Sequence, residues 1–264
     1  MTLSRRQEIA DEKIIVLQKV LIPLVNKMHE KGDFCFKTVP AKGSGTGDYW
    51  VPIDDIKGRY LYAYFDEDPD WVVSSSQKIA DDYQKVIAEY QKQKPEEFQN
   101  ILENGKEWLF GKLLTWGGSV VEEGLLDHSE IAKLTDDFQK SIDKKGERFF
   151  GYFHGNVIGD HVYVDEEKNL YLLSMQIVPR PGRGYYDFLR TLDWLLLKTD
   201  CDFEKIVSWM KQNIENQDWE EIKLVFALRC LGILGWDMLH RGDMGKGDTE
   251  KKKEFLLKFI RREY

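Results

Sequence analysis

The 264-residue sequence has little cysteine, little proline and no long apolar run. Its three cysteines, Cys35, Cys201 and Cys230, are too few and too scattered for a disulfide framework or a metal cluster, and their odd number suits a reducing compartment. A membrane-spanning helix needs roughly 18 consecutive apolar residues, and no window supplies them. The polar residues 1–8 also lack the apolar core of a secretory signal. We therefore expect a cytoplasmic protein with no membrane partner.

Positive charge is also in deficit. The chain has 38 lysines and arginines against 46 aspartates and glutamates, which gives a formal net charge of -8. Such a charge repels phosphate backbones, so we expect no nucleic-acid partner. The composition, with 42% hydrophobic and 32% charged residues, excludes a disordered or low-complexity chain and suits one packed domain or two small lobes.

The first part of the chain predicts one long helix followed by a small sheet. Apolar residues recur at helical spacing over residues 8–28, with Pro23 as a potential kink. Strand-like runs follow at 34–39, 49–53 and 59–65, separated by turn-forming residues. These runs predict an antiparallel sheet of two or three strands directly after the helix.

The rest of the chain predicts a larger, mainly helical part. The acidic stretch 66–70 is typical of a connector, and a helical pattern with breaks at Pro95 and at Gly117–Gly118 runs from 74 to about 144. Residues 162–164 and 170–173 flank a turn and predict a β-hairpin. Four further helices are predicted over residues 185–197, 203–214, 219–239 and 250–262.

The most informative stretch runs from Phe153 to Asp165, through His154-Gly155-Asn156, and is followed by Tyr186-Asp187. In its order and spacing it resembles the catalytic core of aminoglycoside phosphotransferase and choline kinase-like enzymes, which have a protein-kinase-like fold. The resemblance implies an α+β fold with a reduced N-terminal lobe, residues 1–68, made of a helix and a small antiparallel sheet. It also implies a mainly helical C-terminal lobe, residues 69–264, that contains the catalytic-loop hairpin.

The resemblance assigns a role to each position of the loop. His154 falls on the family's histidine, and Asn156 stands where the family has its catalytic aspartate. An amide accepts a hydrogen bond but takes up no proton at neutral pH. His161 stands at the metal-binding asparagine, and Ser174 at the second metal-binding aspartate. An imidazole nitrogen and a neutral hydroxyl are poor ligands for Mg²⁺. At the two cofactor-binding positions, His161 and Ser174, the family's metal ligands are therefore replaced by weaker ones.

The phosphate-binding elements of the family have no counterpart in this sequence. Its glycine-rich loop and nucleotide-pairing lysine are missing, and the glycine-rich run 43–47 is no replacement because no Gly-Lys-Ser/Thr motif follows it. We interpret that run as an ordinary turn. A separately encoded chain that supplies the missing strands is a further alternative.

These substitutions predict a degenerate phosphotransferase, or pseudokinase, that transfers no phosphate, needs no cofactor, and acts as a noncatalytic module for a protein or small-molecule partner. The alternative is a small-molecule phosphotransferase that uses Mg-ATP and non-standard residues, with Asp160 or Asp165 as the base. His154 and His161, with Asp160 beside them, could suggest a zinc site. The two histidines are seven residues apart across a loop and have no third strong ligand, so we expect no zinc or other metal site there.

Two other features have a functional and a structural interpretation. Arg180 and Arg183 lie in the short loop 179–186. They either contact an anion or an acidic partner, or they pair with acidic side chains on the protein's own surface. We favour the second interpretation. Most of the eight tryptophans are expected in the core. Trp71 and Trp116, in segments predicted to be connectors, either stack a ligand between the lobes or pack at their junction, which we favour.

Overall fold

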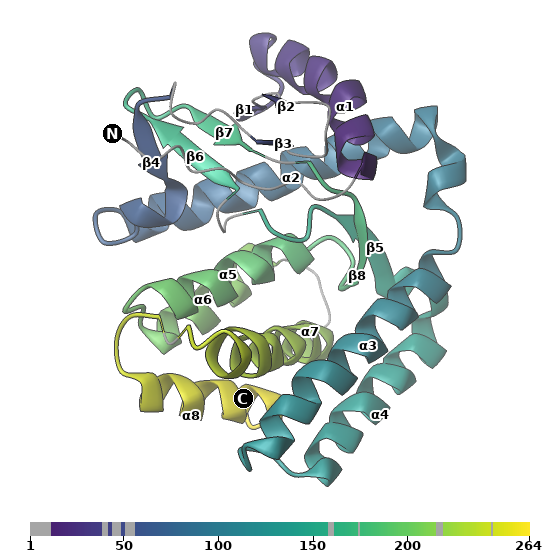
Figure 1. Ribbon diagram of the computed structural model, residues 1–264, viewed down its shortest axis with the longest axis vertical. Coiled ribbons are helices and arrows are strands. Elements are labelled where there is room, and N and C mark those ends of the chain that lie inside the picture. Colours follow the sequence, from purple (N-terminus) through teal and green to yellow (C-terminus); the bar gives the residue numbers. More distant parts are fainter. Residues whose placement is uncertain are drawn as a thin grey trace. The chain divides into compact units, whose positions relative to one another are not determined.

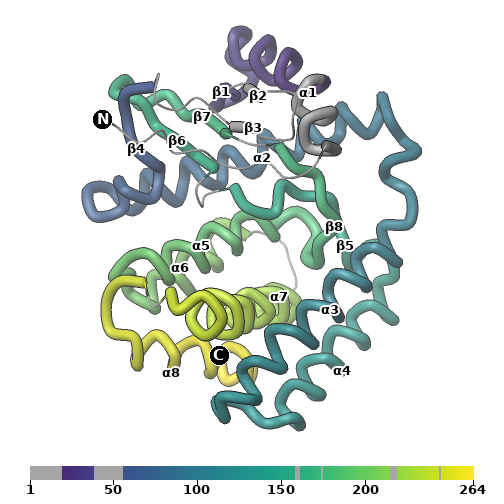
Figure 2. The backbone as a smooth tube through the Cα atoms, in the orientation of Figure 1, coloured from purple at the N-terminus to yellow at the C-terminus, as the bar shows by residue number. Residues whose placement is uncertain are grey.

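The computed structural model describes residues 12–38, 42–43, 49–50, 56–157, 161–173, 175–214, 219–243 and 245–264, with the backbone alone for 12–19, 42–43 and 49–50 (Figures 1 and 2). Contacts divide the chain into two compact units: unit 1 is Met1–Glu97 with Phe153–Val178, and unit 2 is Phe98–Tyr152 with Pro179–Tyr264. The predicted hairpin therefore groups with the N-terminal elements, and this division does not coincide with a boundary after residue 68. The division into domains 1–68 and 69–264 therefore remains a prediction.

A four-stranded mixed sheet forms the centre of unit 1, in the order β1-β7-β6-β4. The antiparallel hairpin of β6 (Val162–Asp165) and β7 (Leu170–Leu172) lies in the middle. β1 (Phe36–Thr38) pairs with β7 in parallel, and β4 (Gly58–Tyr60) pairs with β6 antiparallel. Alternate residues of these strands, such as Val162 and Val164, are buried, as expected for a sheet with one face in the core.

The predicted hairpin is confirmed, but the prediction that the early strands form their own antiparallel sheet is wrong. β1 and β4 are not neighbours, because the hairpin lies between them. The short strands β2 (Lys42–Gly43) and β3 (Tyr49–Trp50) do pair antiparallel, in a separate sheet. Residues 61–64, predicted as strand, form a 3-10 helix because Leu61 and Tyr64, three residues apart, are both buried. Residues 44–47 of the glycine-rich run lie outside the described residues.

Two helices pack in unit 1. α1 (Glu12–Glu30) contains Pro23, and its Asn26 side chain is hydrogen-bonded to both the N–H and the C=O of Thr38, which fixes β1 against the helix. α2 (Pro69–Gln93) begins at Asp68, whose side chain accepts the backbone N–H of Trp71. The predicted connector therefore ends in a helix cap, and Trp71 lies in a helix rather than in a connector.

Unit 2 is mainly helical. Its helices are α3 (Ile101–Glu122), α4 (His128–Lys145), α5 (Tyr186–Lys198), α6 (Phe203–Asn213), α7 (Trp219–Gly232) and α8 (Thr249–Ile260), with a 3-10 turn at Gly146–Phe149. Another 3-10 turn, Pro95–Phe98, spans the division between the two units. β5 (Phe150–Phe153) and β8 (Val178–Pro181), most of whose residues belong to unit 2, form a two-stranded sheet. The described chain is thus mixed α and β, with helices predominating, and the four C-terminal helices agree with the sequence prediction.

The predicted helix break at Gly117–Gly118 is wrong, because α3 continues to Glu122. Gly117 serves packing instead: a Cβ there would lie 3.0 Å from Ile131 of α4. Trp116, expected in a connector, is therefore a buried residue of α3. The predicted helix 219–239 is present, but its type changes along its length, since α7 passes directly into a π-helix at Ile233–His240.

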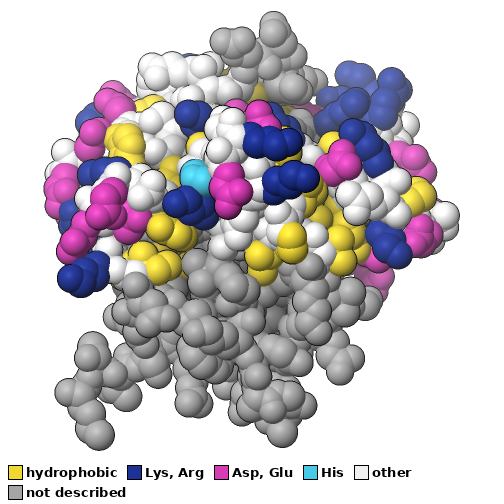
Figure 3. Space-filling model, turned by 90° about the horizontal axis from the view of Figure 1, so that it is seen from above, with side chains coloured by type: hydrophobic (Ala, Val, Ile, Leu, Met, Phe, Trp, Pro, Cys, Tyr) yellow, Lys and Arg dark blue, Asp and Glu magenta, His cyan; other side chains and the backbone are white. Residues whose placement is uncertain are grey.

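The surface carries charges of both signs. Figure 3 shows Lys and Arg side chains interspersed with Asp and Glu and with hydrophobic side chains on one face. Among the described helices, none has both the length and the apolar character that crossing a membrane requires.

Candidate functional site

The loop between β5 and β6 carries the predicted catalytic residues, and His154 is its anchor. The His154 side chain is fully buried, with its ring edge-to-face against Tyr83 of α2 at 5.0 Å between centroids. Its Nδ1 accepts the backbone N–H of Asn156 at 3.2 Å, so the neutral ring carries its proton on Nε2. Gly155, between them, has a φ of 82°, a conformation that favours glycine. The His-Gly pair therefore shapes the loop from inside the core.

Asn156 lies at the position where the resemblance places the catalytic base. The residue is half-buried, and its Oδ1 is buried with no hydrogen-bond partner in the described part of the chain. A buried carbonyl oxygen without a donor is uncommon, so this amide has an open acceptor position. Its chemistry is that of a neutral acceptor, since an amide cannot remove a proton from a hydroxyl.

His161 is close to His154, with 5.5 Å between the ring centroids. It is 7% exposed, and its carbonyl accepts the Leu173 N–H at 2.7 Å, which closes the end of the hairpin. The structure thus brings three predicted site residues, His154, Asn156 and His161, into one loop and hairpin. The other two, Asp160 and Ser174, lie outside the described residues.

Asp165, the alternative base, is committed to the hairpin turn. Its carboxylate accepts the Asn169 backbone N–H at 2.8 Å, the Asn169 side-chain amide at 2.8 Å and the Tyr171 hydroxyl at 3.0 Å. Burial opposes ionisation of this group, but the hydrogen bonds from Asn169 and Tyr171 outweigh it and hold the pKa of Asp165 below its ordinary value. A carboxylate that already accepts three hydrogen bonds is a structural group and a poor proton acceptor.

Two adjacent residues of α2, which the sequence analysis did not identify, bind backbone groups beside β7 and β1. The Tyr83 hydroxyl donates to the carbonyl of Gln176 at 2.7 Å, just beyond β7. Asp82 accepts the backbone N–H of Cys35 at 2.8 Å, just before β1. Burial and then the hydrogen bond with Asp82 raise the pKa of the Cys35 thiol to about 12, which makes it unreactive. Nothing in the helical pattern of α2 distinguishes these residues from ordinary core positions.

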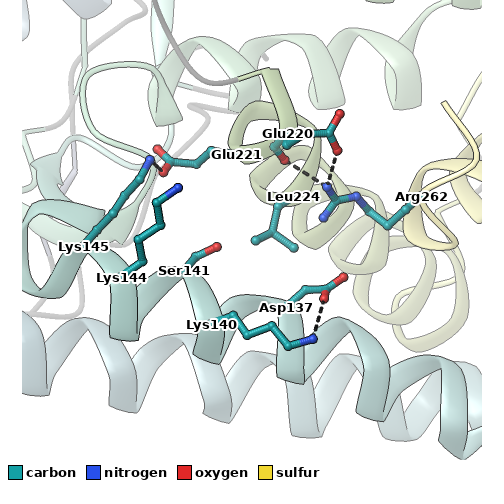
Figure 4. A pocket seen from close by; sticks show the side chains of 9 residues that line it. All are labelled: Asp137, Lys140, Ser141, Lys144, Lys145, Glu220, Glu221, Leu224 and Arg262. Carbon is teal, nitrogen blue, oxygen red and sulfur yellow. Dashed lines mark hydrogen bonds and ion pairs between the residues drawn. The ribbon is translucent and has the colours of Figure 1, made fainter.

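A separate cavity in unit 2, of about 250 Å³, lies where α4 faces the start of α7 and Arg262 (Figure 4). Its charged groups largely pair with each other. Lys140 lies 3.5 Å from Asp137, and Arg262 lies 3.1 Å from Glu220. Glu221 binds Lys145 and also accepts the Tyr185 hydroxyl at 2.6 Å. The cavity is therefore close to self-neutralised and offers little to a charged ligand.

Within the described part of the chain, no three His, Cys, Asp or Glu side chains are grouped so that they could hold a metal ion. Comparison with known proteins finds no matching family model, no matching curated protein and no matching solved structure.

Proposed function

We propose that this chain is a degenerate member of the kinase-like fold, a pseudokinase that transfers no phosphate and acts as a noncatalytic binding module. The observation that carries the proposal is the neutral amide of Asn156 beside the buried His154. Phosphoryl transfer to a hydroxyl requires a carboxylate that orients the hydroxyl and accepts its proton, and an amide supplies only the orientation.

The environment of His161 supports the same proposal. The resemblance places this residue where phosphotransferases have an oxygen ligand for Mg²⁺, yet the residue is only 7% exposed and its ring packs edge-on against His154. Mg²⁺ prefers oxygen ligands in an octahedral arrangement. A buried imidazole in an aromatic contact is suited to holding the loop together and poorly suited to binding this ion.

Asp165 gives a third line of support. A phosphotransferase with non-standard residues needs a free carboxylate near the loop, and Asp165 has its oxygens occupied by Asn169 and Tyr171. Using Asp165 as a base would release the hairpin turn. In the proposed pseudokinase, Asp165 stays in the hairpin turn, and the loop keeps its shape as a scaffold for a protein or small-molecule partner. It lacks the groups that would perform phosphoryl transfer.

A nucleotide titration tests the proposal. The thermal midpoint of the full chain is followed with ATP or ADP at millimolar concentrations, each in Mg²⁺ and in EDTA. Because a ligand that binds the native state raises the midpoint, we expect no Mg²⁺-dependent shift. A shift that appears with Mg²⁺ and disappears with EDTA contradicts the proposal and favours the alternative, a small-molecule phosphotransferase with unusual residues.

A further inference from the structure

One face of α3 in unit 2 carries two tryptophans and a lysine at four-residue steps: Trp108, Lys112 and Trp116. Arg180 of β8 lies over the Trp108 ring, with its guanidinium carbon 3.9 Å from the centroid. The Lys112 ammonium lies 5.2 Å from the Trp116 centroid, and the two indole rings are 6.1 Å apart. We call Trp108, Lys112, Trp116 and Arg180 the tryptophan–cation cluster.

Neither cation of this cluster forms an ion pair among the described residues. Arg180 donates to the carbonyl of Pro179 at 2.7 Å, and Lys112 is half-buried on α3. Across the ranges that the structure describes, no carboxylate lies within ion-pair distance of either side chain. Neighbouring Arg229 differs, because it is paired with Asp193 and donates to the Tyr186 hydroxyl at 3.0 Å.

Burial makes this lack of counter-charge costly. Desolvation lowers the pKa of Lys112, and the charges of Arg180 and Arg229 lower it further. Desolvation also lowers the pKa of Arg180, and Tyr186 and Asp187 only partly offset it. Two partly desolvated cations that repel each other are stabilised by any anion that comes between them.

Trp116 adds a buried hydrogen-bond donor. The residue is 7% exposed, and its indole N–H has no acceptor among the described residues. The benzene edge of the ring packs on Gly232, where a Cβ would lie 3.0 Å from Cζ3, so the N–H edge is turned away from that contact. Buried donors normally have an acceptor, and this one lies on a ring that Lys112 faces.

We propose that the tryptophan–cation cluster is an oxyanion site, which binds a phosphate, sulfate or carboxylate group through Lys112, Arg180 and the indole N–H of Trp116. Guanidinium and ammonium groups are the usual partners of such anions, and Trp108 and Lys112 are each partly exposed to solvent. The site shares no residue with the proposed pseudokinase loop, so either proposal can fail without the other.

The test titrates inorganic phosphate, sulfate and acetate separately into the full chain at constant ionic strength, with chloride as the balancing ion. Tryptophan fluorescence and the thermal midpoint are both recorded. We expect a saturable response to at least one oxyanion, with a millimolar dissociation constant. The anion that binds most tightly identifies the class of ligand group.

Variants assign the response to the cluster. Lys112→Gln and Arg180→Gln each remove a charged donor and should weaken binding about tenfold or more. Trp116→Phe keeps an aromatic ring at this position but removes the indole N–H, and should weaken binding about threefold to tenfold. Lys106→Gln on α3 and Arg183→Gln after β8 are matched controls that should bind like the original chain.

The proposal is overturned if no oxyanion gives a saturable response up to tens of millimolar, or if Lys112→Gln binds as tightly as Lys106→Gln. Circular dichroism verifies that each variant is folded. If Arg180→Gln does not fold, the comparison of Lys112→Gln with Lys106→Gln decides the matter, because Lys112 has no hydrogen bond or ion pair in the described structure to lose.

Discussion

Nδ1 of His154 accepts the backbone N–H of Asn156 across 3.2 Å. This contact fixes both the tautomer of a fully buried histidine and the direction of the loop that carries Asn156. The histidine thus shapes the loop from inside the core, while the residue that it positions is a neutral amide. That combination, a retained frame with an inert side chain, is the basis of the proposed function.

Restoring the acid alone should not restore chemistry. In Asn156→Asp we expect no turnover of ATP with any hydroxyl-bearing acceptor, because His161 still stands where the resemblance places an oxygen ligand for Mg²⁺. Asn156→Ala is the matched control, and ATP consumption is measured in Mg²⁺ for both. Activity in Asn156→Asp alone would mean that the rest of the machinery is intact.

Asp165→Asn should destabilise the protein in a pH-dependent manner. Replacing one carboxylate oxygen by NH₂ opposes donors from Asn169 or Tyr171 and should cost about 1–3 kcal/mol near neutral pH. The pKa of Asp165 is lower in the folded protein than its ordinary value of 3.8, so its stabilisation is present above that value and is lost as pH falls through the folded pKa. Urea unfolding at several pH values should show the gap between the two proteins closing in acid. A gap that stays constant contradicts the assignment.

Breaking the buried ion pair of Arg229 and Asp193 should lower the free energy of unfolding substantially. Both side chains are nearly inaccessible, at 7% and 0%. Removing the guanidinium takes away one of the two arginine partners of Asp193, the other being Arg190, and the donor to the Tyr186 hydroxyl. We expect Arg229→Met to lose about 3–5 kcal/mol of unfolding free energy. Arg261→Met, which breaks the more exposed pair of Arg261 with Glu130, should lose at most about 1 kcal/mol. Similar losses in chemical denaturation would count against this view of the core of unit 2.

Two glycines should respond in opposite ways to alanine. A Cβ at Gly58 of β4 would lie 1.9 Å from the Val164 carbonyl oxygen, so Gly58→Ala must push β4 away from β6 and should cost about 1–3 kcal/mol or more. Gly111 lies in α3, with open space around its Cα, and Gly111→Ala should gain about 0.5–1 kcal/mol from helix propensity. The thermal midpoints of the two variants should move in opposite directions, and parallel movement would refute the β4–β6 register.

Local sequence patterns predicted where the helices and strands lie better than they predicted which strands pair with each other. Helical spacing located α5, α6 and α8 to within about two residues, and the turn at Asp165–Asn169 located the hairpin. The pairing of β1 with β7 joins Phe36 to Leu170, and alternation of apolar residues says nothing about which distant strand is adjacent. The sheet order was therefore beyond a reading of local sequence.

The two candidate sites differ in the same respect: one is built from contiguous residues, and the other from residues far apart in the sequence. The loop of His154 and Asn156 was found because its residues are contiguous and resemble a known motif. Arg180 and Trp116 were named only separately, as alternatives to structural roles, and were not placed in one cluster. Arg180 comes from a strand far along the chain, and Trp116 was assigned to a connector because a helix break at Gly117–Gly118 was expected. The four-residue spacing of Trp108, Lys112 and Trp116 was the available signal.

The most direct measurement of the central claim is the turnover of the unaltered chain itself. Release of ADP from ATP is followed in Mg²⁺ and in Mn²⁺, with and without a panel of small hydroxyl-bearing acceptors, against a blank without protein. A loop built around a neutral Asn156 predicts a rate equal to the blank under every condition. A metal-dependent rate above the blank, abolished in Asn156→Ala, would contradict the account.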